Sequence, residues 1–501
     1  MSLAIVYSRA KAGINAPLVT VEAHLSNGLP SLAIVGLPEA AVKESRDRVR
    51  SAILNAQFEF PTRRITINLA PADLPKEGGR FDLAIALSIL AASGQLPPQS
   101  LNQSEFLGER ALTGELRAIP GALPASLQCS RQQRTLFVPT ANASEATLPK
   151  QASVLAANHL LEVTSHLKGQ QLLHTFHNPA LVTDTTPSAD LNEVFGQYQA
   201  KRALEIAASG GHNLILQGHP GSGKSMLAAR LPSILPALQE SYAMEVASLR
   251  SIANLPFDLQ NWLLPPYRAP HHSASSAALV GGGSNPKPGE ISLAHRGVLF
   301  LDEFPEFDRR VLEVLREPLE AGQINISRIN QQVCFPAQFQ LVAAMNPCPC
   351  GYFGHKKITC HCSPDQVRRY RQKISGPLLD RIDLQVDVPA NTHEVISAEV
   401  QHGDSSETVK QRVSKAQRYQ KARQGCLNAE LGSQLLLVHC VLSAENRQLM
   451  SQAVDRLGLS ARAYHRTLKV ARTIADLRQE KILTSKHLLE ALNLRTSVLF
   501  K

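Results

Sequence analysis

Short runs of hydrophobic residues, several of them alternating with polar ones, characterise the first third of the chain. Such alternation is typical of strands that bury one face. Apolar residues recur at helical spacing over 39–56 and again over 81–92, which predicts two helices. We expect strands at 3–7, 18–24, 32–35 and 64–69. Residues 1–175 are therefore expected to form a self-contained mixed α/β domain.

The pattern changes twice further along the chain. Residues 176–190 mix turn formers with few large apolar side chains, which indicates a linker. From 191 to 400, strand-like runs alternate with helical segments, as in a parallel α/β sheet. Residues 401–501 have mostly helical periodicity, with an apolar stripe over 461–477 and Ser485 as the expected N-cap of a last helix. The predicted fold class is α/β with a helical C-terminal domain.

A glycine-rich segment follows the buried strand predicted at 213–217. It runs from Gly218 to Ser225 and leads into a helix that is expected to end at Pro232. Strand, glycine loop and helix in this order predict a P-loop, in which backbone N–H groups surround phosphates. Lys224 would reach the β- and γ-phosphates, and the Ser225 hydroxyl would bind Mg²⁺. The predicted nucleotide-binding residues are Gly218, His219, Pro220, Gly221, Ser222, Gly223, Lys224, Ser225 and Met226.

Two later strands end in polar side chains. The strand predicted at 297–301 is followed by Asp302 and Glu303, and the one at 340–345 by Asn346. Parallel strands present a ligand crevice at their carboxyl ends, so these side chains are expected beside the P-loop. We expect Asp302 to hold Mg²⁺ through water, Glu303 to polarise an attacking water, and Asn346 to contact the γ-phosphate. The sequence therefore predicts nucleoside triphosphate hydrolysis.

Two arginines follow Asn346 in the chain. Arg381 lies in a turn, and Arg462 opens the helix predicted at 461–477. An arginine supplied by a neighbouring subunit raises nucleotide turnover by about 10³–10⁵ because it meets transition-state charge. The alternative for each is an ordinary surface salt bridge.

Four of the eight cysteines form two C-x-C pairs, Cys348/Cys350 and Cys360/Cys362. Four thiolates suit tetrahedral Zn²⁺ in a structural site. A histidine in place of one sulfur, or four reduced thiols without metal, are the alternatives. The remaining residues of this type, expected to be small buried side chains, are Cys129, Cys334, Cys426 and Cys440.

Composition limits the partners. Among 501 residues, no apolar run approaches the roughly 20 residues of a membrane span, and the N-terminal run is too short for a signal peptide. A cytoplasmic protein without a membrane partner is therefore expected. The net charge of +10 permits a polyanionic partner. Lys287, in the glycine-rich segment 267–289, and Arg328, in a hairpin predicted at 323–335, are the candidate DNA contacts; ordinary solvated loops are the alternative.

Three longer segments resemble a known family. Residues 288–303, 344–351 and 373–383 are similar to the magnesium-chelatase-like AAA+ ATPases and, more closely, to the bacterial ComM/YifB competence family. The resemblance covers essentially the whole chain. It implies an AAA+ core at 191–400 with a cysteine insertion at 348–362, and a helical lid at 401–501. The site roles that it implies are Walker A at 218–225, Walker B at Asp302 and Glu303, sensor 1 at Asn346, an arginine finger at Arg381 and sensor 2 at Arg462.

This resemblance also implies a function. It implies an ATP- and Mg²⁺-dependent hexameric ring that drives branch migration on branched, single- and double-stranded DNA during natural transformation and homologous recombination. Recombination proteins would be candidate partners. The alternative is a protein-remodelling ATPase that acts like the chelatase motor subunit.

The N-terminal part resembles the Ser-Lys peptidase domain of Lon, which has a fold of the ribosomal protein S5 domain 2 type. Arg80 and Pro124 stand where Lon carries its serine and its lysine. A hydroxyl nucleophile needs a neighbouring base, so peptidase activity is not expected. The domain is instead expected to act as a scaffold or binding cap, with Lys76, Arg80 and the segment 46–50 as its candidate binding surface.

Overall fold

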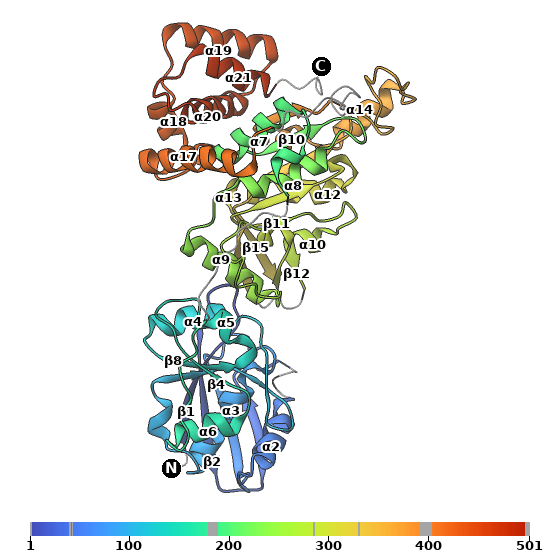
Figure 1. The fold of residues 1–501 in the computed structure, drawn as a ribbon. Helices are drawn as coiled ribbons and strands as arrows, with labels where there is room; N and C mark the ends of the chain where they lie inside the picture. The colour runs from blue at the N-terminus through green and yellow to red at the C-terminus, as the bar shows by residue number, and fades with distance from the viewer. Residues whose placement is uncertain are drawn as a thin grey trace.

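The computed structural model describes residues 3–39, 42, 44–178, 189–283, 286–328, 331–389 and 403–495, with only the backbone of Arg328 and Gln331. Figure 1 shows an N-terminal unit, a central α/β unit and a group of C-terminal helices, arranged one after another. Most of the predicted linker at 176–190, and the predicted boundary at 400/401, lie outside the described residues. No described helix has both the length and the apolar character needed to cross a bilayer.

The N-terminal unit is built on a seven-stranded mixed sheet of order β3-β4-β2-β1-β5-β8-β9. Its helix α3 (Asp82–Ala92) is buried along its whole length and packs on β1 and β2. The predicted strands are confirmed, and the helix predicted over 39–56 is confirmed as α2 (Ser45–Asn55), while residues 40, 41 and 43 of its predicted first part lie outside the described residues. The strands are β1 (Leu3–Arg9), β2 (Leu18–Ser26), β3 (Ser31–Val35), β4 (Arg64–Ala70), β5 (Ser104–Phe106), β8 (Thr135–Pro139) and β9 (Ser153–Ala157).

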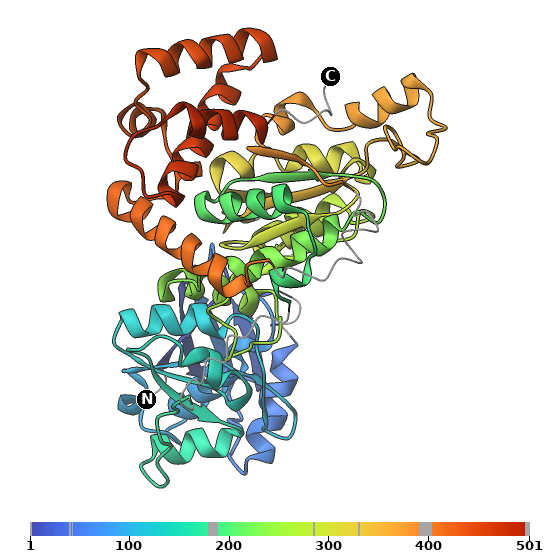
Figure 2. The same ribbon diagram turned by 45° about the horizontal axis from the view of Figure 1, so that its top comes forward.

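The central unit contains the predicted parallel sheet, with five strands in the order β11-β14-β17-β10-β18. Alternate side chains of β10, β14 and β17 enter different cores, because successive residues of a strand point to opposite faces. Helices cover both faces (Figure 2). The strands are β10 (Leu214–Gln217), β11 (Tyr267–Arg268), β14 (Val298–Leu301), β17 (Gln340–Met345) and β18 (Leu384–Asp387); the main helices are α7 (Tyr198–Gly210), α8 (Lys224–Ile234), α9 (Glu240–Ile252) and α12 (Arg309–Val314).

One expectation for the central unit needs correction, and one alternative is narrowed. Helix α8 does not end at Pro232 but continues to Ile234. Proline lacks only the N–H group, and its carbonyl still accepts a hydrogen bond from the Leu235 amide at 3.2 Å. The segment 267–289 is not only loop: it contains β11, α10 (Ser276–Val280) and the short pair β12 (Gly281–Gly282) and β13 (Lys287–Pro288). The ring of Tyr267 stacks on Phe300, which attaches this segment to the sheet.

The predicted hairpin at 323–335 is confirmed as β15 (Gln323–Arg328) and β16 (Gln331–Pro336). Its inward side chains Ile324, Ile326, Val333 and Phe335 are buried in the core beneath the sheet. The hairpin is therefore anchored along one face and free along the other.

The C-terminal part is helical, as expected. The helix predicted at 461–477 is confirmed as α20, but Ser485 is the first residue of the last helix rather than its cap. Thr484 is the N-cap, and it forms a capping box with His487. The helices are α17 (Ser406–Gln424), α18 (Ser433–His439), α19 (Ala444–Leu457), α20 (Ala461–Leu477) and α21 (Ser485–Asn493).

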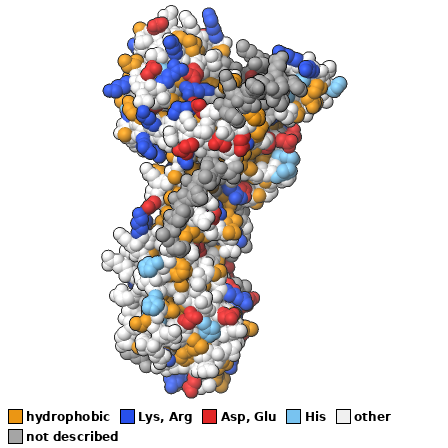
Figure 3. Space-filling model, in the orientation of Figure 1, with side chains coloured by type: hydrophobic (Ala, Val, Ile, Leu, Met, Phe, Trp, Pro, Cys, Tyr) orange, Lys and Arg blue, Asp and Glu red, His pale blue; other side chains and the backbone are white. Residues whose placement is uncertain are grey.

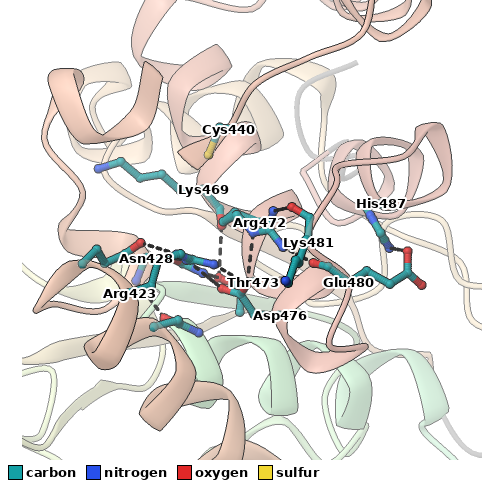
Figure 4. A network of polar contacts seen from close by, with 12 residues as sticks. Arg423, Asn428, Cys440, Lys469, Arg472, Thr473, Asp476, Glu480, Lys481 and His487 are labelled. Atoms are coloured by element: carbon teal, nitrogen blue, oxygen red, sulfur yellow. Dashed lines mark hydrogen bonds and ion pairs between the residues drawn. The ribbon is translucent and has the colours of Figure 1, made fainter. Parts of the chain in front are cut away.

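A buried polar network holds these helices together (Figure 4). Asp476 on α20 accepts hydrogen bonds from Arg423 at 2.6 and 3.0 Å, from Arg472 at 3.0 Å and from Asn428 at 2.8 Å. The Thr473 hydroxyl, one turn earlier, lies 2.7 Å from Nε2 of His212, which precedes β10. The network therefore extends from the helices to the central sheet.

Asp383 makes the second link between α20 and the sheet. Its carboxylate, only 2% exposed, accepts from Arg466 at 2.6 Å and from the Asn213 backbone amide at 3.0 Å. Burial opposes ionisation of Asp383, but the charge of Arg466 outweighs it and holds the pKa of this carboxyl well below its usual range. Helix α20 is thus fixed at the amino ends of β10 and β18.

We predict that Asp383→Asn destabilises the central unit by about 3–5 kcal/mol at pH 7, because Arg466 loses its buried counter-charge. Since the folded-state pKa is depressed, the native ion pair contributes its stability above pH about 4 and loses it as the pH falls through the folded pKa. Chemical denaturation of both proteins between pH 7 and pH 3 measures the difference. Asp365→Asn, which removes an exposed ion pair with Arg368, is the control and should change stability by less than about 1 kcal/mol.

Candidate functional site

The P-loop lies between β10 and α8. Gly218 accepts no side chain, since a Cβ there would lie 2.3 Å from the Val388 carbonyl oxygen. Gly221 and Gly223 have φ of +76° and +89°, the left-handed region that glycine adopts without strain. Helix α8 begins directly afterwards, so the N–H groups of its first turn are free to face an anion.

Lys224 and Asn346 meet at the centre of this loop. Strands β10 and β17 end at the same level, which brings Gly218 beside Asn346. The Lys224 ammonium, almost fully buried, donates to the Gly218 carbonyl at 2.8 Å, the His219 carbonyl at 3.0 Å and Oδ1 of Asn346 at 3.1 Å. Burial lowers the pKa of Lys224, and the charge of Asp302 opposes that shift.

The oxygen ligands expected for Mg²⁺ are adjacent. The Ser225 hydroxyl donates to Oδ2 of Asp302 at 2.5 Å, and the Glu303 amide donates to the other oxygen at 2.9 Å. Hydroxyl and carboxylate oxygens are the hard donors that Mg²⁺ prefers, so this donor set fits the ion. The structure thus brings together five predicted residues, namely Lys224, Ser225, Asp302, Glu303 and Asn346.

His272 was missed as a member of this site. Its Nδ1 lies 2.9 Å from Oε2 of Glu303, and its ring lies against that of His271. Glu303 itself has a φ of +51°, an uncommon conformation for a residue with a side chain. The sequence does contain a signal for this contact, namely the histidine pair 271–272 shortly after β11. Strand β11 is the parallel neighbour of β14, so the residues that follow the two strands lie at the same edge of the sheet.

Arg381 and Arg462 lie elsewhere. The Arg381 carbonyl accepts from the Asn213 side chain at 3.0 Å, and Asn213 precedes β10, whereas the P-loop follows it. Arg381 is buried and pairs with Glu320 in α13 (Pro318–Ala321); this hydrogen bond lowers the pKa of the Glu320 carboxyl. Arg462 is largely exposed and lies 3.9 Å from the same carboxylate. The structure therefore does not bring either arginine to the P-loop of its own chain.

The four clustered cysteines converge. The Sγ atom of Cys348 lies 3.4 Å from that of Cys350 and 3.7 Å from that of Cys360, and Cys350 lies 3.5 Å from Cys360. With Cys362, all four sulfurs lie within 4.8 Å of one another. Zinc–sulfur bonds of about 2.3 Å in a tetrahedron separate the sulfurs by about 3.8 Å, so the donor set fits a metal ion.

The cysteine loop is fastened to the P-loop. Nδ1 of His219 donates to the Gly351 carbonyl at 2.9 Å, and its ring meets that of His355 edge-on at 4.8 Å. A Cβ at Gly351 would lie 2.5 Å from Cγ of Pro220. Sequence reasoning did not foresee this contact, because it depends on how two loops from different strands approach each other.

Comparison with known proteins identifies the family. A family model described as magnesium chelatase, subunit ChlI, matches residues 190–396, and a model of the ChlI C-terminal part matches residues 403–495. A third model, described as subunit ChlI of Mg-chelatase, matches residues 21–142. Competence protein ComM of Haemophilus influenzae is 51% identical over 99% of this chain and 98% of that protein. The chain belongs to the ComM/YifB family of magnesium-chelatase-like AAA+ ATPases.

Two further relatives complete the comparison. YifB of Escherichia coli is 50% identical over 99% of this chain and 97% of that protein, and carries no functional description. The magnesium-chelatase 38 kDa subunit of Chlorobaculum tepidum is 26% identical over 42% of this chain and 58% of that protein. The ComM/YifB proteins therefore match the full chain, whereas the chelatase subunit matches a part.

The binding surface expected on the N-terminal unit of this ComM/YifB protein is partly wrong. Lys76 is fully buried and donates to the Pro71 carbonyl, and Arg80 is 4% exposed. Burial lowers the pKa of Arg80 to about 10, while Glu77 and Glu145 oppose that shift. These two cations are enclosed by the fold and cannot form a surface.

Other basic candidates have different surroundings. Arg46 and Arg50 are exposed, but Arg48 between them pairs with Asp82 at 2.8 Å. The Lys287 side chain is exposed on β13, as a DNA contact requires. The Arg328 side chain lies outside the described part of the structure.

One of the isolated cysteines also differs from expectation. Cys129 and Cys440 are buried and Cys426 is half-buried, but Cys334 is exposed. It lies on the outer face of β16, between the buried Val333 and Phe335, so strand alternation turns it to solvent.

We predict that the purified protein contains about one zinc ion per chain, and that Cys360→Ser lowers this content severalfold because a tetrahedral site loses one of its four ligands. Elemental analysis measures the metal content. Cys334→Ser is the matched control, since that thiol is exposed and outside the cluster. Equal metal content in both variants would contradict a metal site at the cluster.

Proposed function

We propose that this protein is an ATP-driven DNA motor that promotes branch migration and heteroduplex extension during natural transformation and homologous recombination. It acts in the cytoplasm as a homo-oligomeric ring of six subunits. The observation that carries the proposal is the separation of the site: Lys224 and Asn346 lie at one end of β10, and Arg381 and Arg462 lie at the other. Hydrolysis then needs a neighbouring subunit to supply the arginines. The name of the Haemophilus relative supports a role in competence.

The residues have the following roles in this proposal. The P-loop amides and Lys224 bind the ATP phosphates, and Ser225 and Asp302 would hold Mg²⁺, which neutralises phosphate charge when bound. Glu303 polarises the attacking water, and Asn346 contacts the γ-phosphate. Arg381 and Arg462 of the neighbouring subunit stabilise transition-state charge. Zinc at the cysteine cluster is structural, because four protein ligands leave no open position.

ATPase measurements with and without a four-way DNA junction test the function. The proposal expects the junction to stimulate hydrolysis severalfold, and expects ATP to drive strand exchange at the branch. Absence of stimulation, together with absent or salt-insensitive DNA binding, would exclude the DNA motor. That outcome would favour the second candidate, a protein-remodelling ATPase, which the partial match to the magnesium-chelatase 38 kDa subunit supports.

We predict that Lys224→Ala abolishes nucleotide binding and turnover, because the phosphates lose their principal cation. Glu303→Gln should lower kcat at least about 100-fold and retain ATP binding, because the amide cannot polarise water. A nucleotide-binding assay beside steady-state ATPase kinetics separates the two effects. Normal turnover in Glu303→Gln would show that another residue is the base.

We predict that Arg381→Ala acts across the subunit interface. A mixture of Arg381→Ala with Lys224→Ala should recover part of the ATPase activity that each variant lacks, since some interfaces combine an intact P-loop with an intact arginine. Mixing Lys224→Ala with Glu303→Gln is the control and should recover none, because both residues belong to the same P-loop site. Equal activity in the two mixtures would contradict a role in trans.

A further inference from the structure

The cysteine loop and α14 (Pro364–Gln372) form a lobe at the edge of the central unit, which we call the cysteine projection (residues 348–373). Figures 1 and 2 show it extending away from the sheet, and Figure 3 shows Lys and Arg side chains near its outer end. The projection has six cations and one carboxylate, Asp365. The cations are Lys356, Lys357, Arg368, Arg369, Arg371 and Lys373.

Three of these cations are exposed and differ from the others in their surroundings. Among the described residues, no carboxylate lies within ion-pair distance of Lys356, Lys357 or Arg369, and all three are exposed. Arg368 is exposed too, although it pairs with Asp365 at 2.8 Å. A solvated positive surface, with three cations that no described carboxylate pairs with, is suited to a polyanion.

The turn that carries the two lysines is held in place. Nδ1 of His355 accepts from the backbone amides of Lys357 at 3.0 Å and Ile358 at 2.9 Å. On the other side of the lobe, the guanidinium of Arg371 lies 5.3 Å from the centre of the Phe353 ring, which joins the turn to α14. The cysteine cluster connects the two ends of the same loop. The cations are thus presented on a fixed scaffold, which reduces the entropy lost when a ligand binds.

We propose that the cysteine projection binds the phosphate backbone of duplex DNA, with Lys356 and Lys357 as principal contacts. This inference rests on the proposed DNA motor and assigns it a contact surface separate from Lys287 and Arg328. Phosphate contacts by lysine and arginine position a duplex without reading its sequence, as a motor that moves along any sequence requires.

The same lobe is in direct contact with the nucleotide site. Gly351 accepts from His219 in the P-loop, and Cys348 follows Asn346 by two residues. A displacement of the projection by DNA is therefore transmitted to two groups that surround Lys224. In this arrangement, binding of DNA at the projection and binding of the ATP phosphates at the P-loop affect one another without a conformational change elsewhere in the subunit.

Charge reversal of the full-length protein tests the inference. Lys356→Glu/Lys357→Glu should weaken binding of a fluorescent DNA duplex at least about 10-fold in 0.1 M salt. The slope of log K against log salt should become shallower by about 1.8, because two phosphate contacts of about 0.9 each are lost. Lys415→Glu/Arg418→Glu on α17 is the matched control: it changes the net charge equally at exposed sites, and should leave the slope unchanged.

The outcomes separate this inference from the proposed function. If the unmodified protein does not bind DNA, the motor itself is excluded. If it binds and both double variants behave alike, the projection is not the contact surface and only the present inference fails. Should Lys356→Glu/Lys357→Glu lose its metal or melt at a lower temperature, Lys356→Gln/Lys357→Gln replaces it; an unchanged salt slope in that variant would equally overturn the inference.

Discussion

The buried carboxylate of Asp383 is the constraint on which the arrangement of the site depends. Removing a carboxylate from water is costly, and Arg466, His212 and the Asn213 amide offset that cost. Because Arg466 belongs to α20, its ion pair with Asp383 holds this helix against the sheet. Strand β10 has four residues and spans only about 13 Å, yet it separates this anchor from the P-loop. The fixed position of α20 thus keeps Arg462 at the amino end of the sheet, away from the P-loop of the same chain.

The sequence was sufficient to predict a parallel central sheet, three of its five strands (β10, β14 and β17) and the five residues gathered at its carboxyl edge. Buried parallel strands produce continuous apolar runs, and the polar residue after each run marks where it ends, so Asp302 and Asn346 could be located from local pattern alone. The hairpin at 323–336 followed from the same alternation. All of these features are determined by residues that are close together in the sequence.

Features set by packing between distant segments were not predictable in this way. The burial of Lys76 and Arg80 depends on how the N-terminal unit closes over them, and charge on its own suggested the opposite. The contact between His272 and Glu303 requires knowledge that β11 neighbours β14. The end of α8 and the N-cap of α21 differ from their predicted positions. A single proline or serine near a helix end can take several positions, and tertiary packing decides between them.

The close fit between Gly351 and Pro220 has a consequence for how this protein can change over time. Because a methyl group at residue 351 would overlap the proline ring, an enlargement in one of these two loops requires a reduction in the other. The two stretches are separated by 130 residues in the chain but are obliged to vary as a pair. A chimera that takes one loop from a relative and keeps the other would combine surfaces that were never selected to fit.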